Sequence, residues 1–283
     1  MGSTRQQRSK CRVEQIGPTL DRMKGRADEG QVRSIATRGY LAESQRPLSI
    51  LVFLLPLLAA YELGAWLYLS GGEDGPTTIA AWGMLSRVFE TFGVVGLHLP
   101  AVLLVTVLLV WHVLQREPWR VRPMVLIGMA MEACVWTVPL TILLIIVDSV
   151  LGGGGENAAT ALVQTGGGAG LRELPWQARL TISAGAGLYE ELVFRMILIA
   201  AAHTLLVDVL RLSNRTGGVI AVLVSAIAFA LYHQQAGAGG GLAWALPYLV
   251  AGLYFGVLYL ARGFGLVVVV HFLYDVVALL VSG

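Results

Sequence analysis

The chain has 283 residues, of which 56% are hydrophobic and only 13% are charged. Ordinary soluble domains carry about 25% charged residues, so this composition excludes a typical soluble enzyme and indicates a membrane protein. The formal net charge of +2 gives no sign of a strongly basic surface, and no nucleic-acid partner is expected. The two cysteines, Cys11 and Cys134, suggest neither a disulfide framework nor a cysteine metal site.

The first 46 residues differ from the rest of the chain. They contain ten Lys and Arg residues against five Asp and Glu residues, and they lack the apolar core of a signal peptide. We expect residues 1–46 to form a basic, disordered cytoplasmic tail, or alternatively a segment that lies on anionic lipid.

Long apolar runs follow this tail and predict an all-α, polytopic transmembrane helix bundle. A bilayer span needs about 20 apolar residues. About seven spans are expected, at residues 48–70, 92–114, 124–150, 178–210, 217–236, 243–261 and 264–282. A weaker stretch at 77–91 is either a surface helix or an eighth, re-entrant element, and the glycine runs of residues 151–170 predict a loop.

Basic residues predict the orientation. Sixteen of the 20 Lys and Arg residues fall on one side of a seven-span arrangement. By the positive-inside rule, the N-terminus is then cytoplasmic and the C-terminus lies outside. The protein is expected in the plasma (inner) membrane, with the lipid bilayer as its surroundings.

Ionisable residues interrupt three of the last four predicted spans. A charged side chain at the bilayer centre costs at least ~2.5–3.5 kcal/mol, so each is a candidate functional residue. The segment GLYEELVFR carries Glu190, Glu191 and Arg195, and the other two spans carry His233 and the pair His271 and Asp275. Glu62 and Glu132, in earlier spans, are weaker candidates for the same cavity.

Helical spacing predicts different partners for the two glutamates. Glu191 and Arg195 are four residues apart, the spacing of a helical ion pair. Glu190 points about 100° away around the helix, and is free to face another group. His271 and Asp275 share a helix face, as do Phe229 and His233.

This set of residues fits the activation of water for peptide-bond hydrolysis. In a partly dry cavity Glu190 is the candidate base, assisted by His233, and His271 with Asp275 is the candidate oxyanion site. The zinc-protease signature HExxH and a GxSG serine setting are absent. No cofactor is favoured, but a divalent metal such as zinc held by His233, His271 and Glu190 is an open alternative.

Three motifs resemble those of one known family. EELVFR at 190–195 resembles the EExxxR motif of the CAAX-protease and bacteriocin-processing (CPBP) family, FALYH at 229–233 its FxxxH motif, and HFLYD at 271–275 its HxxxN/D motif. The resemblance implies an intramembrane endopeptidase of membrane-associated proteins or peptides. The resemblance also implies roles for single residues. The catalytic ones would be Glu190, His233, His271 and Asp275, and the supporting ones would be Glu191, Arg195 and Phe229.

On this basis residues 171–283 are expected to form the catalytic transmembrane core. Residues 47–170 would supply the N-terminal transmembrane helices and the glycine-rich loop. One position departs from the prenyl-protein enzymes, which have Asn where this chain has Asp275. An ionised carboxylate cannot donate a hydrogen bond to an oxyanion. Asp275 is therefore either protonated or only orients His271.

Two other classes of function are alternatives. Intramembrane Glu, His and Asp also serve proton-coupled transporters, but these often carry internal repeats, and EExxxR has no counterpart in the first half of the chain. A non-catalytic scaffold or bacteriocin-immunity-type protein would not need the complete Glu, His and His set found here.

Overall fold

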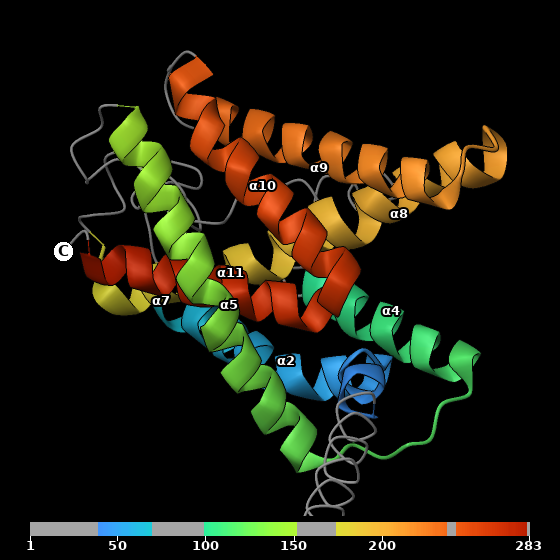
Figure 1. Cartoon of the computed structure of the whole chain (residues 1–283). Coiled ribbons are helices and arrows are strands. Elements are labelled where there is room, and N and C mark those ends of the chain that lie inside the picture. Colours follow the sequence, from blue (N-terminus) through green and yellow to red (C-terminus); the bar gives the residue numbers. More distant parts are fainter. Residues whose placement is uncertain (1–38, 70–98, 152–173, 237–241, 282–283) are drawn as a thin grey trace, which may run out of the picture. The chain divides into compact units, whose positions relative to one another are not determined.

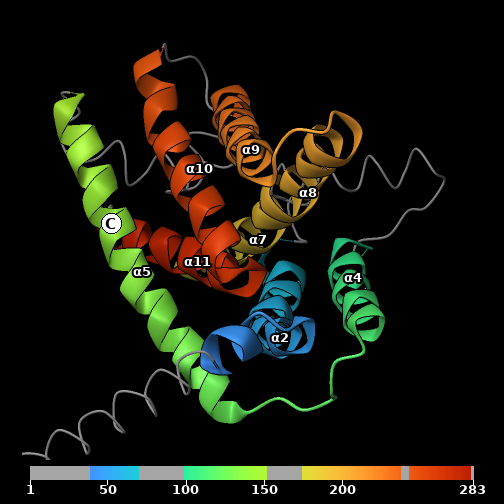
Figure 2. The ribbon, with the colours of Figure 1, turned by 45° about the vertical axis from the view of Figure 1, so that its right-hand side comes forward.

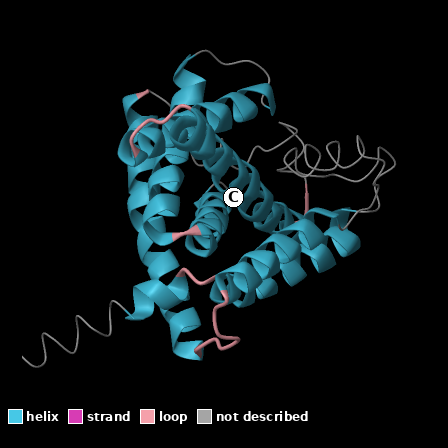
Figure 3. Ribbon diagram, turned by 90° about the vertical axis from the view of Figure 1, so that its right-hand side faces the viewer, coloured by secondary structure: helices cyan, strands magenta, loops and turns pink. Residues whose placement is uncertain are grey.

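The computed structural model describes residues 39–69, 99–151, 174–236 and 242–281. Within these ranges the regular elements are helices, with no strand (Figures 1 and 3), which confirms the predicted all-α fold. The chain divides into two compact units, residues 1–43 and 44–283. In the first unit residues 39–43 are helical, ahead of the boundary expected at residue 46. The elements described below belong to the second unit.

The described helices follow the predicted spans closely. They are α2 (Pro47–Gly64) with the π-helical η1 (Ala65–Leu69), α4 (Leu99–Gln115), α5 (Pro123–Val150), α9 (Asn214–Ala236), α10 (Leu242–Arg262) and α11 (Phe264–Val281). Between α5 and α9 runs a continuous helical segment made of α7 (Trp176–Gly185), η3 (Ala186–Glu190), η4 (Leu192–Ile199), α8 (Ala200–His203) and η5 (Thr204–Val209).

Five stretches of the described chain are long and apolar enough to cross a membrane. They are Pro47–Leu69, Pro123–Val150, Trp176–Val209, Asn214–His233 and Ala245–Arg262. Pro100–Gln115 and Phe264–Leu279 are shorter apolar helices at the two remaining predicted positions. The protein is therefore a multi-pass integral membrane protein. The stretch 77–91 and nearly all of the loop predicted at 151–170 lie outside the described residues.

Proline and glycine set several helix ends. Pro47 and Pro123 occupy the first turns of α2 and α5, where a missing backbone N–H costs no hydrogen bond. Gly263 has φ +87°, and its N–H donates to the carbonyl of Tyr259 at 2.8 Å. A glycine in this left-handed conformation ends α10 and lets α11 begin at the next residue.

Helix α11 is the centre of the bundle. It contacts α2, α5, α7, α10, η3 and η4, and Figures 1 and 2 show it between these helices. Its first half is buried on every side, as expected for a helix that is apolar all round: Phe264, Leu266, Val267, Val268 and Val270. By contrast, α5 exposes a row of apolar side chains that fits contact with lipid: Met124, Met131, Val135, Val138 and Ile145.

Small residues allow the closest helix approaches. A Cβ atom on Gly187 would lie 2.9 Å from the carbonyl oxygen of Val268, and one on Gly252 would lie 2.9 Å from Cα of Ala226. Glycine at these positions therefore lets η3 press against α11 and lets α10 press against α9. These two contacts bring the predicted polar residues of different helices to one place.

Candidate active site

Glu190 and Arg195 lie on two π-helical segments, and Glu191 lies between these segments. Glu190 is the last residue of η3, and Arg195 lies within η4. The offset of about 100° predicted for Glu190 applies to α-helical winding, whereas the chain here forms the wider turns closed by i→i+5 hydrogen bonds. Such turns occur inside longer helices and frequently at functional sites.

Glu191 binds two partners. Arg195 Nη1 lies 3.0 Å from Glu191 Oε1, which is the ion pair predicted from the spacing, and both side chains are fully buried. His271 Nδ1 also lies 2.7 Å from the same oxygen. The contact between Glu191 and His271 was not predicted, because it joins residues 80 positions apart and no local spacing signals it.

Arg195 is enclosed by aromatic rings. Its guanidinium carbon lies 4.3 Å from the ring centroid of Phe229 and 5.2 Å from that of Phe255. Its Nη2 donates to the carbonyl of Gly252 at 3.4 Å. Cation–π contacts of this kind are strongest where water is excluded, so the rings help to keep a charged side chain inside the bundle.

Glu190 faces both predicted catalytic histidines. Its Oε1 accepts a hydrogen bond from the hydroxyl of Tyr232 at 3.4 Å. Its Oε2 lies 3.6 Å from His233 Nε2 and 3.9 Å from His271 Nε2, and all three of these buried atoms lack a hydrogen bond. Polar atoms at this spacing are too far apart for a direct hydrogen bond and close enough to share one water.

In each histidine, the hydrogen bond made by Nδ1 determines whether Nε2, the nitrogen that faces Glu190, carries a proton in the neutral ring. His233 Nδ1 lies 2.9 Å from the carbonyl oxygen of Phe229 and must be the donor, so Nε2 of a neutral His233 is a proton acceptor. His271 Nδ1 donates to Glu191. Its Nε2 is therefore a donor only when the ring carries a second proton.

Asp275 completes the cluster on α11. It is buried, and its Oδ1 lies 3.8 Å from His271 Nε2, beyond direct hydrogen-bond distance. The structure thus brings together all seven residues predicted for the site: Glu190, Glu191, Arg195, Phe229, His233, His271 and Asp275. Glu132 is elsewhere, since its Oε2 accepts from Arg262 Nη2 at 2.7 Å.

The donor atoms of the cluster are farther apart than the ligands of a tetrahedral zinc site. Zinc–nitrogen bonds of about 2.0–2.1 Å place two tetrahedral ligands roughly 3.3 Å apart. The donors of Glu190, His233 and His271 are spaced more widely, and the described part of the chain has no group of three His, Cys, Asp or Glu side chains placed to hold a metal ion. A metal would require these side chains to move closer together.

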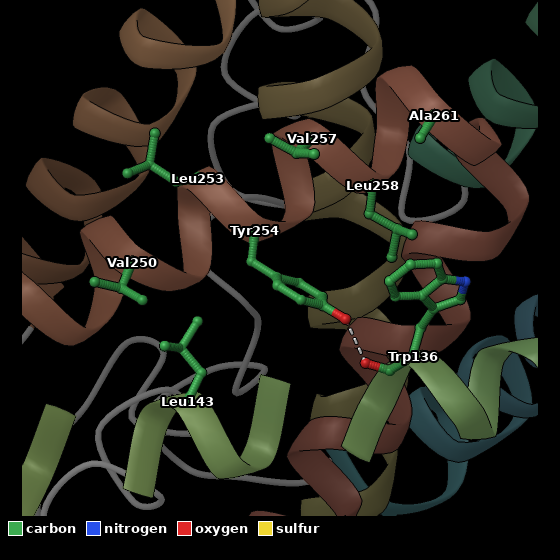
Figure 4. A pocket seen from close by; sticks show the side chains of 8 residues that line it. All are labelled: Trp136, Leu143, Val250, Leu253, Tyr254, Val257, Leu258 and Ala261. Carbon is green, nitrogen blue, oxygen red and sulfur yellow. Dashed lines mark hydrogen bonds between the residues drawn. The ribbon is translucent and has the colours of Figure 1, made fainter. Parts of the chain in front are cut away.

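A pocket of about 380 Å³ lies apart from this cluster, between α5 and α10. Figure 4 shows Leu143 of α5 below Val250 of α10, and Tyr254 of α10 pointing toward Trp136 of α5, where the Tyr254 hydroxyl donates to the carbonyl of Trp136 at 2.6 Å. None of the seven predicted site residues lines it. It is lined by apolar groups and offers no acid–base chemistry.

The fold and the cluster together define a multi-pass membrane protein with buried acid–base groups on neighbouring helices. Residues 172–277 match the family described as type II CAAX prenyl endopeptidase Rce1-like. The match contains all three motifs and confirms the predicted resemblance of this part of the chain to the CAAX-protease and bacteriocin-processing family. It supports a membrane protease activity in general. Comparison with curated proteins and with solved structures gave no match.

Proposed function

We propose that this protein is a glutamate-type intramembrane endopeptidase that hydrolyses a peptide bond of a membrane-associated protein or peptide. One observation carries the proposal. The free oxygen of Glu190 faces Nε2 of both His233 and His271, at 3.6 and 3.9 Å, in a cluster closed to solvent. A scaffold or immunity protein has no need of this convergence.

In the proposed reaction Glu190 and His233 activate the water. The water oxygen adds to the peptide carbonyl carbon while one of its protons passes to Glu190, and Nε2 of His233 accepts a hydrogen bond from the other O–H of the water. The carbon–nitrogen bond then breaks, and the same proton passes to the leaving amine. The products are a carboxylic acid and an amine, so one water is consumed for each bond cleaved.

His271 is the proposed oxyanion donor. Glu191 holds its Nδ1, and a ring that carries a second proton on Nε2 can donate from there to the negative oxygen of the tetrahedral intermediate. Asp275, 3.8 Å from that nitrogen, is proposed to orient the ring rather than to contact the oxyanion as a carboxylate. Arg195 neutralises Glu191, so that no second uncompensated negative charge lies beside Glu190.

A metal-dependent mechanism uses the same residues differently. Glu190, His233 and His271 would then be the ligands, and a divalent ion such as zinc would polarise the attacking water. The proteins that name the matched family act on CAAX prenyl substrates. Peptides with a prenylated C-terminal cysteine are therefore one substrate class to test, beside unmodified membrane peptides.

The test measures cleavage of membrane peptides by the protein in liposomes. The peptides form a proteome-derived library with two arms, one of prenylated and one of unmodified peptides. Wild type is compared with Glu190→Ala, Glu191→Gln and the control Glu117→Gln, which removes a partly exposed acid outside the cluster. Each is assayed with and without a chelator. We expect Glu190→Ala to lose at least ~10²-fold in rate, the control to match wild type, and the chelator to have no effect.

Each other outcome has a defined meaning. Cleavage that a chelator abolishes and added zinc restores would assign Glu190, His233 and His271 to metal binding instead of general-base catalysis. A folded wild type that cleaves no peptide in either arm would contradict the protease proposal.

A further inference from the structure

Helix α10 contributes no residue to the three motifs, yet one of its faces touches the site at three points. Tyr248, Gly252 and Phe255 are spaced i, i+4 and i+7, which places them on one side of the helix. The opposite side carries Leu253, Tyr254 and Val257, which line the apolar pocket of Figure 4.

Each of the two aromatic residues lies flat against one catalytic histidine. The rings of Tyr248 and His233 are stacked, with centroids 4.4 Å apart and an interplanar angle of 24°. The rings of Phe255 and His271 are stacked in the same way, at 4.7 Å and 19°. All four side chains are buried. The other ring contacts of these histidines are steeper, with interplanar angles of 50° or more.

The histidines need such a second constraint. Each has one hydrogen bond, from Nδ1 to Phe229 or to Glu191, and Nε2 has none. A single hydrogen bond at the edge of a ring leaves the ring able to turn about that bond. A flat aromatic neighbour removes this freedom, because turning would drive the two rings into each other.

Gly252 lies between the two rings on the same face. Its carbonyl accepts from Arg195 Nη2 at 3.4 Å, and its missing side chain lets α10 approach Ala226 of α9. One stripe of α10 therefore contacts His233, Arg195 and His271, one residue from each of the three motifs.

We propose that α10 is the positioning element of the site, with Tyr248 and Phe255 fixing the ring planes of His233 and His271 so that both Nε2 atoms face Glu190. The inference deepens the proposed protease function and rests on it for its catalytic consequence. It predicts that an aromatic ring is required at Tyr248 and at Phe255.

The first readout does not depend on activity. The chain has five histidines, so selective ¹³C labelling of histidine in detergent-solubilised protein gives a small set of ring signals, assigned by single His→Gln variants. We expect Tyr248→Leu to shift the His233 ring signal and Phe255→Leu to shift that of His271. The matched control Tyr254→Leu, on the opposite face of α10, should leave both signals in place.

The second readout is kinetic, with the peptide library that serves for the wild type. Misplacement of a reacting group by about 1 Å can cost ~10²-fold, so we expect kcat of Tyr248→Leu and Phe255→Leu to fall by about 10–100-fold with KM unchanged. The control Tyr254→Leu should retain kcat within about 3-fold of wild type.

The inference would be overturned if Tyr248→Leu and Phe255→Leu left the histidine signals unshifted, or if both variants kept the kcat of the wild type. A fall in kcat matched by Tyr254→Leu would also overturn it, since general loosening of α10 would then suffice. If the wild type cleaves nothing, the proposed function fails, and the histidine signals by themselves decide whether α10 holds the rings.

Discussion

At the scale of single residues, the buried charge of Arg195 persists because it has specific partners. Arg195 is fully buried, paired with Glu191 at 3.0 Å and enclosed by Phe229 and Phe255. Removing one partner of a buried pair leaves an uncompensated charge, which is far more costly than removing both.

This difference predicts the behaviour of two variants. Arg195→Met should lower the free energy of unfolding by about 3–5 kcal/mol, measured by thermal unfolding in detergent. Glu191→Gln combined with Arg195→Met should regain most of this loss, because methionine fills the space between the two rings and the glutamine oxygen still accepts from His271. A double variant no more stable than Arg195→Met would show that the pair does not carry the effect.

Asp275 gives a second prediction at this scale. We expect Asp275→Asn to keep kcat within about 3-fold of wild type, because an amide oxygen can orient His271 and an amide N–H can donate. Asp275→Ala should lower kcat by ~10-fold or more, since His271 then loses a neighbour on its Nε2 side. Steady-state cleavage of a library-derived peptide measures both. Equal rates in all three proteins would remove Asp275 from the site.

At the scale of elements, the close approach of η3 to α11 determines whether the two halves of the cluster meet. Glu190 is the last residue of η3 and Glu191 follows it, and His271 and Asp275 lie on α11. Gly187 stands between these helices, where a Cβ would come within 2.9 Å of the Val268 carbonyl oxygen and 3.2 Å of the Phe272 nitrogen. Neither backbone atom can move without moving α11.

We therefore expect Gly187→Ala to separate η3 from α11. The variant should lose about 1–3 kcal/mol of stability through overpacking and most of its cleavage activity. Gly218→Ala on α9 is the matched control, because its Cβ would meet only Leu260 Cδ1 at 4.0 Å. Thermal unfolding and cleavage are measured on the same preparations. An active Gly187→Ala would show that the site does not depend on this contact.

At the scale of the whole molecule, the distribution of Lys and Arg predicts how the protein crosses the membrane. The segment of residues 116–122 carries Arg116, Arg120 and Arg122 and is expected to be cytoplasmic. The loop expected at 151–170 carries no basic residue and would lie on the other side.

Labelling of single cysteines tests this orientation. In a background lacking Cys11 and Cys134, Thr165→Cys should react with a membrane-impermeant maleimide added to intact cells. Pro118→Cys should react only after the membrane is opened. The reverse pattern would place the N-terminus outside and contradict the positive-inside prediction.

The sequence by itself determined the helices and predicted which polar residues would lie together in one cluster. The lengths of the apolar runs predicted the described helices to within a few residues, except that residues 92–98, expected in the second span, lie outside the described chain. The i, i+4 spacing predicted the ion pair of Glu191 with Arg195. These features are local, because a helix brings residues three or four positions apart into contact whatever surrounds it.

Only the tertiary structure decided how the site is held together. The contact of His271 with Glu191 spans 80 residues, and the rings of Tyr248 and Phe255 come from a helix that carries none of the motifs. The π-helical winding at Glu190 was also not predicted. Such contacts depend on which faces of separate helices pack together, and close approaches at residues such as Gly187 and Gly252 determine that packing.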